Sequence, residues 1–411
     1  MPRFMTYLFC ATIVATLAGG IGGSFQPARM LLPGAALVAL VTSSVGADAR
    51  IIARAWTMST IMILFGAVSL FWTADVAGGI GLVLAITVGA LSFYVVARAD
   101  LSPQGVEKMT WAWVFVAALS VPIAAYEIVT GSHFAFALDS REIGGNLGQF
   151  PFASIFFGNY NDYSTWLCLA FPITLAAFIN ARTTQARLFA ISVSVSIVGI
   201  IFVNTSRAAL AYVAVISIMY MTVSKKLRAY VAAVVALLIP YVIIRYQEQV
   251  FRLYDFAVLR FEMVGAADES YIQRSGLLDA GYNALRDSFG FGIGVGGFDE
   301  YIIDYYPYLI PNPHNILLEI SVNFGVVALI GFIAFFVHLA LVGWKRRNLP
   351  LQYRLALIGG AASLPVVGII SSQAIGYIYW WIWFATLTAM ATVRTDPAMD
   401  PPLHTIRRLD V

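Results

Sequence analysis

The chain has 411 residues, of which 60% are hydrophobic and only 11% are charged, and its mean hydropathy is +0.80. These values exclude a soluble globular protein and predict an all-α polytopic membrane protein. The formal net charge of +3 gives no sign of a nucleic-acid partner. Cys10 and Cys168 both lie in apolar stretches, so we predict neither a disulfide nor a metal site.

Apolar runs of about 17 to 25 residues are long enough to cross a bilayer as helices. The first run follows a short basic start and has no cleavage site after it, so we interpret it as a span and not as a removed signal. We therefore expect a single membrane domain, 1–411, with about twelve transmembrane helices. The runs lie near 4–23, 30–46, 51–72, 75–97, 109–130, 163–180, 187–204, 207–223, 229–246, 315–343, 355–372 and 374–393.

The distribution of basic residues predicts the topology. With the N-terminus inside, the cytoplasmic segments carry most of the arginines and every lysine, as the positive-inside rule requires. Residues 394–411 then form a basic cytoplasmic tail. Two longer segments fall on the outer face: 131–162, and a large periplasmic loop at 247–313 between the ninth and tenth spans. Long segments on a helical scaffold often carry function.

His314 lies where this large loop meets an apolar helix, in the sequence PNPHNILLEISVNFG of residues 311–325. A histidine at such a border can exchange a proton near neutral pH, which suits a general base. The alternative is a helix-cap or interface histidine. Asn315, Glu319 and Asn323 follow at i, i+4 and i+8, a polar stripe that we expect to face the bundle or a wet cavity.

The remaining histidines are weaker candidates for a base. His338 lies 24 residues along the same helix, about 36 Å away at the usual rise, which places it at the inner face. His404 falls in the cytoplasmic tail, and His133 lies outside without comparable neighbours. The aromatic residues of 377–383 are more typical of a membrane-interface belt than of a sugar-binding platform.

Two arginines on the outer side could hold a phosphate-bearing lipid, because a guanidinium makes bidentate contacts that lysine cannot copy. Arg207 follows Asn204-Thr205-Ser206 between two apolar runs. Arg274 precedes 275–288, which is predicted to be an amphipathic helix on the membrane. The alternative for Arg207 is that its side chain only reaches the lipid headgroups. The alternative for Arg274 is that it lies in water or among headgroups, which is the interpretation that we favour for Arg286.

Two further outer segments have more than one interpretation. In 158–163, Asn161 or Asp162 could cap the sixth span, or the cluster could offer hydrogen bonds and rings to a sugar. Residues 290–298, GFGIGVGGF, contain G-x-G-x-x-G. That motif binds dinucleotides only between a strand and a helix, a context that this segment lacks. Its glycines permit tight turns or close approach to a ligand.

Four of these pieces occur in one order: the Asn161 segment, Ser206-Arg207-Ala208, Arg274 through GIGVGGF, and His314-Asn315 with Glu319 and Gly325. In this order they resemble the O-antigen ligase and polymerase superfamily of bacterial envelope glycosyltransferases. The resemblance covers about the second half of the chain.

This resemblance implies a GT-C-like arrangement and a metal-independent glycosyltransferase without a cofactor. The donor would be an undecaprenyl-pyrophosphate-linked saccharide and the acceptor a glycan or a lipid core, in lipopolysaccharide or exopolysaccharide biosynthesis at the periplasmic face of the bacterial inner membrane. His314 would be the catalytic base, and Arg207 and Arg274 would hold the pyrophosphate. Asn315, Glu319 and Asn161 are further substrate-binding candidates.

The sequence leaves two alternatives open. It does not separate a ligase from a polymerase, because both reactions need the same base and leaving-group chemistry. A transporter or flippase for polyprenyl-linked saccharides is the rival from another class, since twelve spans and polar residues such as Glu127 and Glu319 within them also suit transport. A transporter should have paired discontinuous helices, which the sequence does not indicate.

Overall fold

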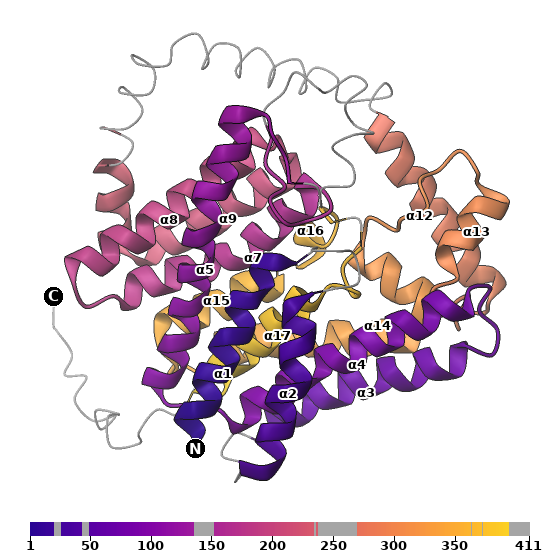
Figure 1. The fold of residues 1–411 in the computed structure, drawn as a ribbon, viewed down its shortest axis with the longest axis horizontal. Coiled ribbons are helices and arrows are strands. Elements are labelled where there is room, and N and C mark those ends of the chain that lie inside the picture. The colour runs from indigo at the N-terminus through magenta and orange to yellow at the C-terminus, as the bar shows by residue number, and fades with distance from the viewer. Residues whose placement is uncertain are drawn as a thin grey trace, which may run out of the picture.

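The computed structural model describes residues 1–19, 26–42, 49–134, 152–233, 236, 269–362, 364–371 and 373–393, and all regular structure within these ranges is helical (Figure 1). The predicted all-α class is confirmed for this part of the chain. Most of the ninth predicted span, the start of the large loop up to 268 and the tail 394–411 lie outside the described residues.

The described part of the chain contains the following helices, in chain order. They are α1 (Pro2–Ala15), the 3-10 helix η1 (Thr16–Ala18), α2 (Pro27–Thr42), α3 (Ala49–Ser69), α4 (Val76–Arg98), α5 (Pro103–Thr130), α7 (Tyr160–Asn180), α8 (Thr184–Val203), α9 (Arg207–Val223), α12 (Glu269–Asp287), α13 (Phe298–Tyr305), α14 (Ile316–Lys345), α15 (Leu351–Ala362), α16 (Leu364–Val367) and α17 (Ile378–Ala391).

Six of the described helices are long and apolar enough to cross a membrane: α3, α4, α5, α7, α8 and α14. Four shorter apolar helices correspond to predicted spans at 4–23, 30–46, 207–223 and 374–393. The predicted span 355–372 is not one helix, because α15 ends at Ala362 and the chain leaves regular structure after α16. A multi-pass helical membrane protein is therefore supported, and the count of twelve spans is not confirmed.

Helix α17 lies at the centre of the bundle, in contact with helices from both ends of the chain: α1, α2, α3, α4, α5, α14 and α15. Tyr379, Trp380, Trp381 and Trp383 on α17 are all at most 1% exposed. The prediction of an aromatic belt was wrong for these four residues, because all four are buried inside the protein. The Trp381 ring packs on Phe93 of α4, and the Trp383 ring on Phe336 of α14. Apolar composition cannot distinguish a helix buried in protein from one that faces lipid.

The long helix α14 is interrupted at Gly325, whose φ of 77° lies outside the helical range. The glycine-rich segment fills the break. The Val326 N–H donates to the Gly290 carbonyl at 2.9 Å, and the Ile293 N–H donates to the Val322 carbonyl at 2.9 Å. A Cβ atom on Gly292 would lie 2.6 Å from the Val322 carbonyl oxygen. These glycines therefore permit close contact with a broken helix, and the segment has no dinucleotide-binding context.

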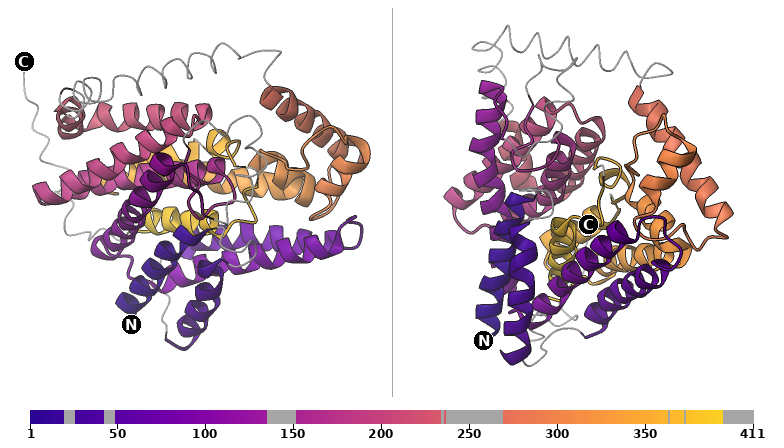
Figure 2. Two further views of the ribbon diagram at one scale, coloured as in Figure 1. Left: turned by 45° about the horizontal axis from the view of Figure 1, so that its top comes forward. Right: turned by 45° about the vertical axis from the view of Figure 1, so that its right-hand side comes forward.

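Helices α12 and α13 stand on one side of the molecule, and α1 and α2 on another (Figure 2). On α12, Leu277 and Ala280 pack with Leu318 and Val322 of α14 in a small separate apolar cluster. Gly281 lies so close to α14 that an added Cβ would be 2.2 Å from the Leu318 side chain. The predicted helix exists, and part of its apolar face is buried against protein, while Leu278 is 49% exposed. Its position on the membrane stays a prediction.

Candidate active site

His314 occupies the last loop position before α14, in a backbone conformation with φ of 46°. A positive φ is unusual for a residue with a Cβ and costs about 1–3 kcal/mol, so the surrounding contacts must hold it in place. The cap of α14 is Asn315, whose side-chain oxygen accepts from the N–H groups of Leu317 at 2.9 Å and Leu318 at 3.3 Å. The helix-cap alternative for His314 is therefore wrong.

The pKa of His314 is lowered from 6.5 to about 4, mainly by burial and then by the positive charge of Arg274, while a hydrogen bond to the Ser371 backbone acts in the opposite direction. The imidazole is therefore neutral near pH 7 and can accept a proton. The electrostatic effect of Arg274 also shows that Arg274 and His314 lie near each other. The packing of α12 on α14 brings them together. Only the neutral form of histidine can act as a base.

Arg207 begins α9, after the N-cap Ser206 and Thr205, whose φ is 53°. Helix α9 contacts α16, and the Gly368 carbonyl just beyond α16 accepts from the N–H of Ile316 at 3.0 Å. Helix α9 and the start of α14 are therefore linked through α16. Arg207 is not among the groups that shift the pKa of His314, and its convergence with His314 and Arg274 stays a prediction.

The N-cap of α7 is Asn159, whose side-chain oxygen accepts from the Asp162 N–H at 2.9 Å. The alternative of Asn161 or Asp162 as the cap was wrong by a few residues. Asn161 is half-buried in the first turn, while Asp162 is 1% exposed. The Asp162 carboxylate accepts from the hydroxyls of Ser371 at 2.5 Å and Tyr377 at 3.1 Å.

Sequence reasoning named Asp162 only within the cluster 158–163 and did not connect it with the candidate base. Since Ser371 contacts both Asp162 and His314, the start of α7, Ser371 and His314 form one connected polar group. The only available signal was a carboxylate at the outer end of an otherwise apolar run. Its partner Ser371 is 209 residues away in the sequence, and no local pattern joins them.

Glu319 and Asn323 face the protein interior, as the polar stripe predicts, and each is 4% exposed. The Glu319 carboxylate accepts from the N–H groups of Ala374 at 2.8 Å and Ile375 at 3.2 Å. The Asn323 side chain donates to the Glu319 carbonyl at 2.8 Å and accepts from the Gly296 N–H at 2.9 Å. Both residues thus hold backbone segments that surround the site.

A cavity of about 450 Å³ lies next to the loop that carries His314, although His314 itself is not part of its lining. Its wall includes Pro313, the residue before the candidate base, and segments from widely separated parts of the chain. The lining residues are Arg29, Asp75, Gly78, Gly81, Leu82, Ala85, Gly296, Phe298, Asp299, Pro313, Glu319, Asn323, Gln373 and Gly376.

Arg29 and Asp299 are two cavity residues that sequence reasoning did not connect. The Arg29 guanidinium donates to the Gly376 carbonyl, which ties α2 to the segment before α17. Asp299 lies in the first turn of α13. Burial, followed by the negative charges of Asp75 and Glu300, raises the pKa of Asp299 from 3.8 to about 6.

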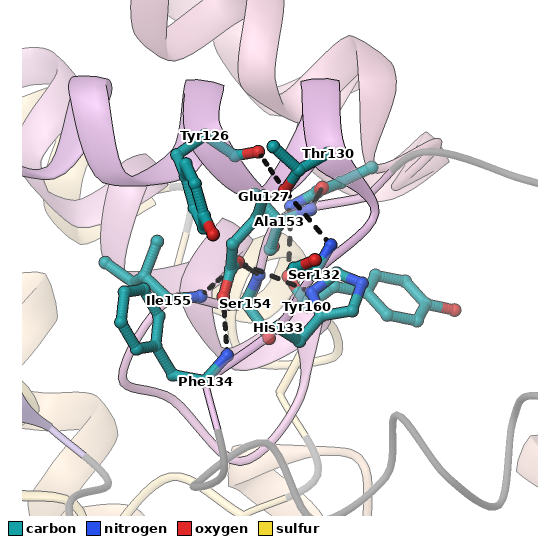
Figure 3. A network of polar contacts seen from close by, with 11 residues as sticks. Tyr126, Glu127, Thr130, Ser132, His133, Phe134, Ala153, Ser154, Ile155 and Tyr160 are labelled. Carbon is teal, nitrogen blue, oxygen red and sulfur yellow. Dashed lines mark hydrogen bonds and ion pairs between the residues drawn. The ribbon is translucent and has the colours of Figure 1, made fainter.

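A second polar network surrounds Glu127 near the end of α5 (Figure 3). Its carboxylate accepts from the N–H groups of Ser154 and Ile155, both at 2.8 Å. The His133 ring stacks on Phe152 with 4.1 Å between ring centroids, and its Nδ1 lies 3.6 Å from the carboxylate. The expectation that His133 lacks comparable neighbours was therefore wrong. None of these residues lines the cavity.

Comparison with known proteins gives two matches. The family described as "O-Antigen ligase" matches residues 191–333, a range that contains Arg207, Arg274, His314 and Glu319. The chain is also 25% identical over 355 residues to the "Teichuronic acid biosynthesis protein TuaE" of Bacillus subtilis (strain 168), a match that covers 83% of this chain and 72% of that protein. Together they confirm the resemblance that the four motifs carried.

Proposed function

We propose that this chain acts as members of the O-antigen ligase and polymerase superfamily do, as a glycosyltransferase of envelope polysaccharide biosynthesis. The donor is an undecaprenyl-pyrophosphate-linked saccharide, the acceptor is a hydroxyl of a glycan or a lipid core, and transfer takes place at the periplasmic face of the inner membrane. The matches to the ligase family and to TuaE support the class of enzyme. Residues 1–411 form one membrane domain, with the loop 247–313 outside and the tail 394–411 in the cytoplasm.

The observation that carries the proposal is a neutral, half-buried His314 that lies near Arg274 and directly follows a residue of a cavity wall, Pro313. In the reaction, the acceptor oxygen forms a bond to the anomeric carbon while the bond from that carbon to the pyrophosphate oxygen breaks. The acceptor proton passes to His314, and the pyrophosphate leaves with the bonding electrons. This requires a base on one side of the sugar and positive charge on the other.

Arg274, with Arg207, holds the leaving pyrophosphate in this scheme without a metal ion. Each charge-assisted hydrogen bond from a guanidinium contributes roughly 1.5–3 kcal/mol. The bound pyrophosphate has a further effect, because its negative charge offsets that of Arg274 and moves the pKa of His314 upward from about 4. The base is therefore strongest when the donor is present.

The other three candidates have more indirect roles. Asn315 fixes the start of α14 directly after the base, and Glu319 fixes Ala374 and Ile375 at the cavity wall. We assign both to positioning of the substrate-binding surface. Asn161, half-buried at the start of α7, is proposed to bind the donor saccharide.

Purified protein in detergent, supplied with lipid-linked saccharide from the producing strain, tests the proposal. His314→Ala should lower glycan transfer by about 10²–10⁴-fold, the usual contribution of general-base catalysis. His133→Ala is the matched control, because it removes another outer-side histidine that does not line the cavity, and we expect it to retain transfer. Near-normal transfer by folded His314→Ala protein would contradict the assignment.

The products of a deletion strain decide between the two acceptors. Acceptors capped with single repeat units indicate a lost polymerase. Lipid-linked polymer that accumulates without transfer to the lipid core indicates a lost ligase.

The transporter alternative has one observation in its favour, the discontinuity of α14 at Gly325, since broken helices bind substrates in many transporters. The hydrogen bonds of the glycine-rich segment to both sides of this break give it a structural explanation. Glu127 and Glu319 likewise accept from backbone N–H groups. Glycan transfer by purified protein in detergent, where there is no membrane to cross, would decide for the enzyme.

A further inference from the structure

The cavity beside His314 has the size and chemistry of a sugar-binding site. Its volume of about 450 Å³ falls within the range of about 300–1,000 Å³ that is typical of ligand pockets. Carboxyl, guanidinium and amide groups on its wall can accept and donate hydrogen bonds, as the hydroxyls of a saccharide require. Gly78, Gly81, Gly296 and Gly376 expose backbone that a sugar ring can approach closely.

The balance of charge in the cavity distinguishes the two substrates of the proposed reaction. Three carboxyl residues, Asp75, Asp299 and Glu319, line it together with one arginine, Arg29. Such a wall disfavours a pyrophosphate, because like charges in a partly desolvated site repel strongly. Positive charge instead reaches His314 from Arg274. Neither of these two residues lines the cavity, but Pro313, directly before His314, does.

Position also favours the acceptor. The attacking hydroxyl must come within hydrogen-bond distance of the base, and Pro313, next to His314 in the chain, forms part of the cavity wall. A saccharide in the cavity would therefore approach His314 from the acidic side, while the donor pyrophosphate approaches from the side of Arg274.

We propose that this cavity is the acceptor subsite and holds the saccharide that carries the attacking hydroxyl, with Asp75 and Asp299 as acceptors and Arg29 and Gln373 as donors of hydrogen bonds to its hydroxyls. This inference rests on the proposed function. It separates the site into an acidic half for the neutral part of the acceptor and a basic half for the leaving group.

Gly81 gives a direct way to block the cavity. It lies on α4 and lines the cavity, and a Cβ atom at this position would meet no heavy atom within 4 Å. A leucine there would extend into open space without displacing a neighbour at its Cβ. Gly199 on α8 is a matched control, since a Cβ there also meets nothing within 4 Å and the residue does not line the cavity.

The experiment measures initial rates of transfer with purified full-length protein while each substrate is varied in turn. The donor probe is lipid-linked saccharide isolated from the producing strain. The acceptor probe is a labelled fragment of the strain's own polysaccharide or its lipid core, as the product analysis indicates. Gly81→Leu should raise the KM for the acceptor at least tenfold and leave the KM for the donor unchanged. Gly81→Ala should have a small effect, and Gly199→Leu none.

Two results would overturn the inference. A rise in the KM for the donor alone would make the cavity a donor site, and unchanged constants in folded Gly81→Leu protein would show that the acceptor binds elsewhere. Thermal unfolding of the same preparations checks folding. Should the leucine variant not fold, Asp299→Asn, which removes a proposed hydrogen-bond acceptor from the cavity wall, should raise the KM for the acceptor and leave the KM for the donor unchanged. Failure of the proposed function is distinguishable, because wild-type protein would then transfer no glycan, or His314→Ala would transfer it normally.

Discussion

Two buried glutamates anchor two segments of this protein in the same way, and only one of them lies at the candidate site. Glu127 accepts from the N–H groups of Ser154 and Ile155, and Glu319 accepts from those of Ala374 and Ile375. Each carboxylate thus replaces the hydrogen bonds that a non-helical segment lacks, which is how irregular backbone is tolerated within a membrane protein.

The two regions differ in what the anchored segment presents. The segment held by Glu127 presents Phe152 to His133, a ring packed beside a carboxylate. The segment held by Glu319 presents Gln373 and Gly376 to a cavity. A glutamate inside an apolar sequence is therefore not by itself a sign of transport or catalysis. The surface that it positions decides its importance.

The first prediction breaks each anchor in turn. Glu127→Ala and Glu319→Ala each leave buried N–H groups without their acceptor, at a cost of about 1–3 kcal/mol for each group, so both variants should unfold at lower temperature than wild type. Per folded molecule, Glu319→Ala should lose transfer by about 100-fold, because displacement of the cavity wall by about 1 Å suffices for that. Glu127→Ala should retain transfer within about threefold.

Activity and thermal unfolding must be measured on the same detergent preparations. An equal loss of transfer in both variants would show that the comparison concerns stability alone. Normal transfer by Glu319→Ala would remove the anchored segment from the site.

The second prediction concerns the charged neighbour of each histidine. His133 lies beside a carboxylate, whereas His314 lies beside Arg274. Arg274→Lys keeps the positive charge but loses the planar fork that binds phosphate through two hydrogen bonds. Loss of one charge-assisted bond of roughly 1.5–3 kcal/mol predicts a fall in transfer of about 10- to 100-fold.

Arg286→Lys is the control, because Arg286 lies near the other end of α12, is 62% exposed, and pairs with Asp287 at 3.0 Å. Its transfer rate should match that of wild type. Full activity of Arg274→Lys would remove bidentate pyrophosphate binding by this residue.

Local sequence signals predicted the start of α14 and the candidate base. Two prolines and the apolar run that follows them placed the helix start at Asn315, one residue from the observed start at Ile316. The break at Gly325 was not predictable, because the apolar run continues through it and the hydrogen bonds that stabilise it come from the distant segment 290–293.

The polar partners of the site depend on the tertiary fold in the same way. Ser371 and Asp162 are 209 residues apart, and Arg29 and Gly376 are 347 apart. A sequence pattern reports which residues share a helix face, but not which helices meet. The burial of α17 was missed for this reason, since its apolar run suits lipid and protein equally well.

The smallest expected effect is a pH dependence of stability in the Glu319 region, caused by Asp299, which lines the same cavity as Glu319. The pKa of Asp299 is about 6 in the folded protein and 3.8 in a free side chain, so between these values the folded state binds more protons than the unfolded state. The contribution of Asp299 to the free energy of unfolding is therefore fully present below about pH 4 and is lost as the pH rises through 6. Solvent screening of a partly exposed carboxyl reduces the loss to about 1 kcal/mol.

Asp299→Asn should abolish this loss, so the variant should gain stability relative to wild type as the pH rises from about 4 to about 6, measured by thermal unfolding in detergent. His314 contributes with the opposite sign, because its pKa is lowered from 6.5 to about 4 and its protonation favours the unfolded state in an overlapping window. The difference between wild type and Asp299→Asn cancels that contribution. A constant difference across the window would contradict the raised pKa and the acidic character of the cavity.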